Sequence, residues 1–69
     1  MRVVITGSSG QIGTNLGLKL LDRGDEVLGL DLRENTWTDA IPTKLVDLLD
    51  ADAMRRALAL ADAVAWPAA

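Results

Sequence analysis

Three glycines at intervals of three residues, Gly7, Gly10 and Gly13, constrain this chain more than any other feature of its sequence. They follow the apolar run Val3–Ile5 and precede a stretch with helical spacing. A strand that passes through a glycine turn into a helix aims the helix's unpaired N–H groups, and the positive end of its dipole, at one point. Gly7 permits the tight turn, Gly10 lets a ligand approach the backbone, and Gly13 lets the helix lie close to the sheet. The pattern predicts a site for an anion such as pyrophosphate, unless the glycines merely close a turn.

Strand-like and helix-like segments alternate along the rest of the chain. Short apolar runs of strand length occupy residues 2–6, 26–30, 44–46 and 63–66. Apolar residues recur at helical spacing in residues 11–23 and 51–61. This order predicts an α/β fold with a parallel sheet and right-handed crossovers.

Residues typical of helix ends and loops support these boundaries. Gly24 supplies a usual stop for the first helix, and Asp50 is a suitable N-cap for the second. Residues 32–42 have no clean period and are expected to form a connecting loop. Within that loop Trp37 has two possible roles, to shield the edge of a ligand or to cap the edge of the sheet. One apolar stripe is expected on the second helix: Met54, Ala57, Leu58 and Ala61.

The segment from Thr6 to Gly13, followed by Leu16, Leu20, Leu21 and Gly24 and then by Glu26–Asp31, resembles the N-terminus of extended short-chain dehydrogenases. That group includes the NAD-dependent nucleotide-sugar epimerases and dehydratases, and the resemblance extends more loosely over the whole chain. It implies a Rossmann-like sheet of strand order 3-2-1-4 with helices on both faces. Residues 1–69 would then form a partial, truncated dinucleotide-binding domain, with a crevice where the strand order reverses.

The resemblance also implies a set of cofactor-binding residues. Asp31, at the end of the second strand, would accept hydrogen bonds from the adenosine ribose and repel a 2′-phosphate, which favours NAD over NADP. Arg33 nearby could instead accommodate that phosphate. Asp47 and Leu48 resemble the pair that contacts adenine, although both Asp31 and Asp47 could simply cap turns. The predicted cofactor-binding set is Gly7, Gly10, Gln11, Ile12, Gly13, Asp31, Leu32, Arg33, Asp47, Leu48 and Ala68.

Composition excludes several other classes of protein. The net charge of −3 and the isoelectric point near 4.5 argue against a basic nucleic-acid surface. The absence of Cys and His excludes a disulfide framework and removes the usual metal ligands, so no metal site is predicted. There is no apolar segment long enough for a signal peptide or a membrane span, and we expect a cytoplasmic protein.

The chain has no tyrosine, so the Tyr-x-x-x-Lys pair of the resembled family is missing and no catalytic residue is predicted. We expect an NAD(P)-binding N-terminal portion of an epimerase/dehydratase-type oxidoreductase that acts on nucleotide sugars. The alternatives are a stand-alone dinucleotide-binding module and an interaction domain that has lost its ligand. A 69-residue chain also buries a small core, so we expect self-association or another chain that completes the sheet.

Overall fold

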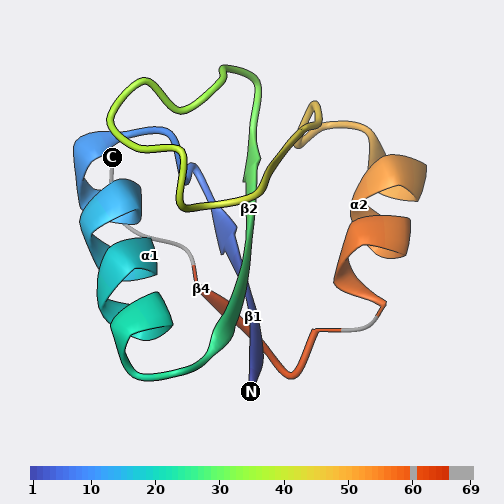
Figure 1. Ribbon diagram of the computed structural model, residues 1–69. Helices are drawn as coiled ribbons and strands as arrows, with labels where there is room; N and C mark the ends of the chain where they lie inside the picture. Colours follow the sequence, from blue (N-terminus) through green and yellow to red (C-terminus); the bar gives the residue numbers. More distant parts are fainter. Residues whose placement is uncertain (60, 66–69) are drawn as a thin grey trace.

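Four parallel strands form the centre of the molecule, in the order β3-β2-β1-β4, as predicted. The computed structural model describes residues 1–59 and 61–65. Helix α1 covers one face of the sheet and α2 covers the other (Figure 1). In chain order the elements are β1 Arg2–Thr6, α1 Gln11–Asp22, β2 Glu26–Asp31, β3 Thr43–Leu45, α2 Ala51–Leu58 and β4 Ala63–Ala65.

The predicted boundaries need small corrections. The first helix ends one residue earlier than expected, and β2 extends by one residue because Asp31 pairs with Leu45. The third strand begins one residue earlier, at Thr43, which pairs with Gly29, and its ladder ends at Leu45. The second helix is predicted to reach Ala61 but ends at Leu58, and the Ala61 N–H donates to the Leu58 carbonyl at 3.1 Å. The predicted last residue of β4, Trp66, lies outside the described residues.

The ends of both helices confirm the capping residues that the sequence predicted. Gly24 adopts a positive φ of 90°, and its N–H donates to the Leu21 carbonyl at 3.0 Å. The Asp25 N–H donates to the Leu20 carbonyl at the same distance, which completes the double hydrogen bond of a Schellman motif. At α2 the Asp50 carboxylate accepts from the Ala53 N–H at 3.1 Å and caps the helix.

The core consists of two layers, one on each face of the sheet. On the α1 face Val3, Ile5, Val27 and Ile41 are buried against Leu16, Leu20 and Leu21 of the helix. On the α2 face the buried residues are Val4, Leu30, Val46 and Met54, and the predicted stripe of α2 packs against them. Neighbouring residues of β1 belong to opposite layers because successive side chains of a strand point to opposite faces.

The loop between β2 and β3 contributes to this core as well as connecting the strands. Ile41 in that loop is only 3% exposed and packs on the α1 face. A Cβ atom at Gly17 of α1 would lie 2.6 Å from Ile41 Cδ1 and 3.4 Å from Ile5 Cδ1. Gly17 therefore lets the helix lie close to the sheet, and it also makes room for Ile41 of the loop. The loop is held beside the glycine turn as a result.

Candidate functional site

The glycine turn lies at the carboxyl ends of β1 and β2, at the top of Figure 1, beside the loop of residues 32–42. Gly7 has a positive φ of 69°, and its N–H donates to the Leu30 carbonyl of β2 at 2.8 Å. The Gly7 carbonyl then accepts from the Gly10 N–H at 3.3 Å, which closes the turn. The strand, turn and helix thus form the arrangement predicted from the sequence.

The three glycines have different structural tasks. Gly7 is required by its backbone conformation, because φ lies in the left-handed region. A Cβ at Gly13 would lie 2.5 Å from the Gly7 carbonyl oxygen and 2.8 Å from Ser8 Cα, so Gly13 lets the helix approach the turn itself, whereas the sequence suggested the sheet. Among residues 1–59 and 61–65, a Cβ at Gly10 would meet only the Gly7 carbonyl oxygen, at an ordinary 3.6 Å. The packing of these described residues does not require a glycine at position 10.

The N-terminus of α1 is left open toward this space. Its N-cap is Gly10, which has no side chain to cap the helix, and its first turn carries no acidic residue. The first intrahelical bond of this end runs from the Thr14 N–H to the Gly10 carbonyl, so the N–H groups of residues 11–13 precede the helical ladder. Unpaired N–H groups at a helix N-terminus can hold a phosphate oxygen.

Asp31 lies against the glycine turn from the end of β2. One of its carboxylate oxygens accepts from the Ser9 N–H and the other from the Arg33 N–H, both at 3.0 Å. Its side chain is 11% exposed, and Arg33 Nε lies 4.0 Å from it. The turn-capping alternative for Asp31 is therefore observed, yet a carboxylate has further lone pairs that can accept from ligand hydroxyls. The carboxylate stands at the rim of the anion site.

A hollow of about 370 Å³ adjoins the glycine turn. It is lined by Ser9, Gly10, Gln11, Arg33, Glu34, Thr36 and Trp37. Trp37 is 62% exposed and forms part of the hollow's wall, a position from which it could shield the edge of a ligand. Three lining residues were not in the predicted set. Ser9 lies within the glycine turn, where the glycines alone signalled a site, and the loop of residues 32–42 brings Glu34 and Thr36 to it.

Four other predicted site residues take no part in the hydrogen bonds described above for the glycine turn: Ile12, Leu32, Asp47 and Leu48. Ile12 and Leu32 are more than half exposed, as expected of residues that border an open site. Asp47 is exposed, and its carboxylate accepts from the Leu49 N–H at 2.9 Å, so it caps the turn after β3. Leu48 is 41% exposed beside it. Ala68 lies outside the described residues.

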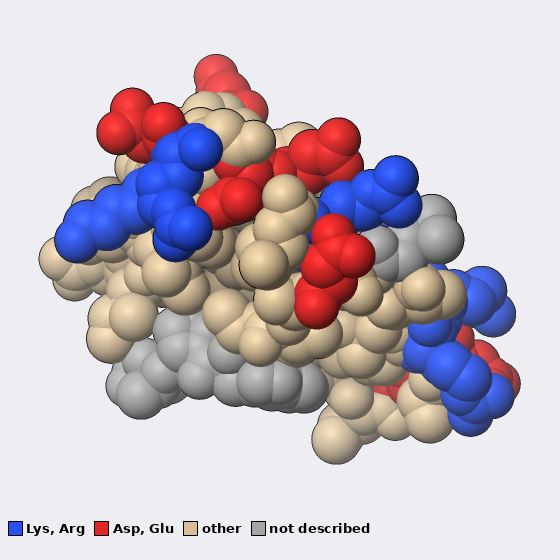
Figure 2. Space-filling view, turned by 90° about the horizontal axis from the view of Figure 1, so that it is seen from below, with Lys and Arg blue, Asp and Glu red and all other residues tan. Residues whose placement is uncertain are grey.

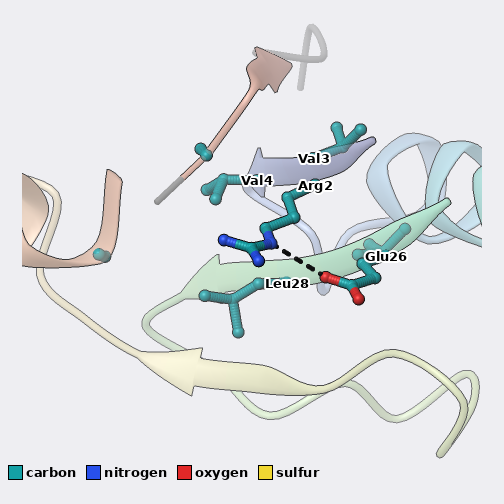
Figure 3. Close-up of a pocket in the computed structure, with 8 residues that line it drawn as sticks. Arg2, Val3, Val4, Glu26 and Leu28 are labelled. Carbon is teal, nitrogen blue, oxygen red and sulfur yellow. Dashed lines mark ion pairs between the residues drawn. The ribbon is translucent and has the colours of Figure 1, made fainter. Parts of the chain in front are cut away.

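A second hollow, of about 180 Å³, lies at the opposite, amino ends of β1 and β2 (Figure 3). Its walls are mostly apolar, and the polar groups at its mouth, Arg2 Nε and Glu26 Oε2, pair with each other at 3.3 Å. Ligands of open parallel sheets bind at the carboxyl ends of the strands. The glycine turn is therefore the candidate site.

The face of the molecule in Figure 2 carries charges of both signs over the described residues. Basic and acidic side chains are interspersed on the face that Figure 2 presents. Within residues 1–59 and 61–65 no helix is long and apolar enough to cross a membrane.

Solved structures with this arrangement include two proteins that carry NAD. A short-chain dehydrogenase/reductase superfamily protein from Agrobacterium tumefaciens with bound NAD matches the whole chain with a TM-score of 0.85 and 28% identity. The complex of Thermus thermophilus UDP-glucose 4-epimerase with NAD matches it with a TM-score of 0.81 and 35% identity. The chain spans only 20% and 24% of the lengths of these two proteins.

Comparison of the amino-acid sequence with known proteins also finds relatives. An uncharacterized protein of Mycobacterium tuberculosis is 38% identical over 66 residues, which are 94% of this chain and 8% of that protein. The profile of the NAD dependent epimerase/dehydratase family matches residues 3–69, and so includes the glycine turn, Asp31 and all of the sheet except Arg2. The chain belongs to the NAD dependent epimerase/dehydratase family.

Proposed function

We propose that this chain binds the adenosine diphosphate half of NAD as the N-terminal part of an epimerase/dehydratase-type enzyme that acts on nucleotide sugars. The observation that carries the proposal is the convergence of two complementary groups at one end of the sheet. The uncapped N-terminus of α1 offers N–H groups for a pyrophosphate, and the Asp31 carboxylate offers acceptors for ribose hydroxyls. Gly10 leaves open the space between the backbone and the ligand.

The choice of NAD over NADP rests on the charge and position of Asp31. Its carboxylate is held by two backbone N–H groups and cannot readily turn away from a 2′-phosphate. Arg33 is the opposing feature, but its side chain is 76% exposed and its Nε already lies near Asp31. A mobile, solvated guanidinium attracts a phosphate less than a fixed carboxylate repels it. NAD is accordingly the proposed ligand.

The residues that follow β3 are the candidates for binding the adenine end of the cofactor. We propose that Asp47 and Leu48 contact the adenine ring, with Leu32 and Arg33 on the ribose side. Both Asp47 and Leu48 are exposed, so they are accessible to a ligand. Asp47 accepts one hydrogen bond, from the Leu49 N–H, and its second carboxylate oxygen is available to an exocyclic amine. Ala68, which the family resemblance suggested, is a further candidate for contact with the cofactor.

The chemical step belongs to groups outside these 69 residues. Bound NAD would supply a hydride acceptor, and this chain would bind and orient it. The sequence contains no tyrosine to act as the family's acid and base. The second candidate is a dinucleotide-binding module without turnover. A downstream Tyr-x-x-x-Lys in the native reading frame would decide for the enzyme, and a stop codon after Ala69 would decide for the module.

Titration followed by NMR tests the binding proposal directly. NAD, NADP, ADP-ribose and adenosine are added separately to the ¹⁵N-labelled chain. We expect weak binding, NAD tighter than NADP, and amide shifts concentrated in residues 7–13 and 31–33. Tighter binding of NADP would overturn the role of Asp31. An absence of shifts in the glycine turn at saturating NAD and ADP-ribose would overturn the proposal as a whole.

A further inference from the structure

The side-chain amide of Asn35 connects two loops that are far apart in the sequence. Its Nδ2 group donates to the Ser8 carbonyl at 3.2 Å and to Thr14 Oγ1 at 2.9 Å. Ser8 belongs to the glycine turn and Thr14 to the first turn of α1. Asn35 itself belongs to the loop between β2 and β3. One side chain therefore joins the loop to both parts of the candidate site.

The oxygen of the same amide organises the loop. Asn35 Oδ1 accepts from the Trp37 N–H at 2.8 Å and from the Thr38 N–H at 3.1 Å. A primary amide has two donor hydrogens and two acceptor lone pairs, so all four positions are used. Only an amide of this length satisfies both sides, because the Ser8 carbonyl can only accept and the loop N–H groups can only donate.

The peptide that joins Ser8 to Ser9 is held from both sides as a result. Its carbonyl accepts from Asn35 Nδ2 and from Thr14 Oγ1, the latter at 3.0 Å. Its N–H donates to the Asp31 carboxylate. Ser8 is 0% exposed and Thr14 is 3% exposed, so water cannot readily replace these partners. This peptide directly precedes Gly10 and the open N-terminus of α1.

We propose that Asn35 is a positioning residue, which holds the glycine turn in the conformation that accepts a phosphate and sets Trp37 in the wall of the adjoining hollow. This inference rests on the proposed binding of NAD, because it assigns the residue that prepares that site. Asn35 acts through the Ser8–Ser9 peptide and through the Trp37 N–H. Its own hydrogen-bonding groups are fully engaged within the protein.

The substitution Asn35→Asp separates the two halves of this role. A carboxylate of the same shape still accepts from Trp37 and Thr38, but it has no donor for the Ser8 carbonyl. Thr14→Val removes the hydroxyl partner from the same network without a change of charge. Ala40→Asp adds a negative charge to an exposed position of the same loop and measures what charge alone does.

Affinities for NAD and adenosine, measured by NMR titration, provide the first test. We expect Asn35→Asp to weaken NAD at least 10-fold and Thr14→Val at least 3-fold, whereas Ala40→Asp stays within 2-fold. Adenosine lacks phosphates, so its affinity should stay within 2-fold of wild type in every variant. A general loss of folded protein would instead lower the apparent affinities for NAD and for adenosine alike. Equal NAD affinity in wild type and Asn35→Asp would overturn the inference while leaving the proposed function intact.

Hydrogen exchange of the ligand-free chain provides the second test of the role of Asn35. It needs no ligand, so it still applies if wild type fails to bind NAD. That failure would contradict the proposed function and not the role of Asn35. We expect Asn35→Asp to speed exchange of the Ser9 amide at least 10-fold while the Trp37 amide stays within 2-fold. The Asn35 side-chain NH₂ of wild type should exchange more slowly than that of exposed Gln11. Equal exchange of the two NH₂ groups, or an unchanged Ser9 amide in the variant, would refute the role of Asn35.

Discussion

Replacement of Gly10 by Ala separates ligand binding from folding at the glycine turn. Gly10 has φ −81° and ψ 171°, a conformation open to any residue, and the new Cβ would lie 3.6 Å from its nearest neighbour. The loss of a Gly N-cap costs less than about 1 kcal/mol, and the reduced freedom of the unfolded chain returns roughly 0.4–1 kcal/mol. We therefore expect the free energy of unfolding to change by less than about 1 kcal/mol.

Binding of NAD should respond much more strongly to the same change. A methyl group in the space where a phosphate meets the backbone overpacks the complex, which costs about 1–3 kcal/mol. That range corresponds to a loss of affinity of roughly 5- to 150-fold. We expect the perturbation to act on the complex, because the described part of the chain leaves that space open.

Gly13→Ala is the matched control. Its Cβ would lie 2.5 Å from the Gly7 carbonyl oxygen and 2.8 Å from Ser8 Cα, two backbone atoms that cannot move aside cheaply. We expect this variant to lose at least about 1–3 kcal/mol of stability. Urea unfolding and calorimetric titration with NAD measure both effects in both variants. Full NAD affinity in Gly10→Ala would refute the assignment of this turn as a phosphate site. Equal destabilisation by the two substitutions would refute the different packing roles of the two glycines.

Other consequences are open to measurement. Ser8 Oγ is buried and has no partner among the described residues, so Ser8→Ala should raise the free energy of unfolding by up to about 1–3 kcal/mol; a loss in urea unfolding would indicate a partner. Leu30 is 0% exposed in the layer on the α2 face, and Leu30→Ala should lower the free energy of unfolding by about 2–5 kcal/mol, as followed by circular dichroism; a smaller loss would show that this layer collapses around the missing side chain. Asp31→Asn should lower the ratio of NAD to NADP affinity in calorimetry, and an unchanged ratio would assign the preference elsewhere. We also propose that the chain self-associates through its sheet edges, where Val64 and Leu45 are exposed; light scattering that gives a monomer at all concentrations would count against it.

The sequence by itself determined the framework of this protein. Apolar runs and helical spacing are local properties, so they predicted six elements in the right order, with errors of one to three residues at the ends. The glycine turn and Asp31 could be placed in the same way, because each directly follows a strand and parallel strands bring their carboxyl ends together. The resemblance to a family then supplied the strand order.

The tertiary structure decided what depends on contacts between distant residues. Ile41 packs beside Gly17, Trp37 forms the wall of the hollow, and Asn35 reaches Ser8 and Thr14, yet all three lie in a loop without a periodic pattern. Periodicity reports only which face of a single element is buried. A hydrogen bond between residues more than twenty positions apart depends on where the chain returns, which only the packed sheet and helix define.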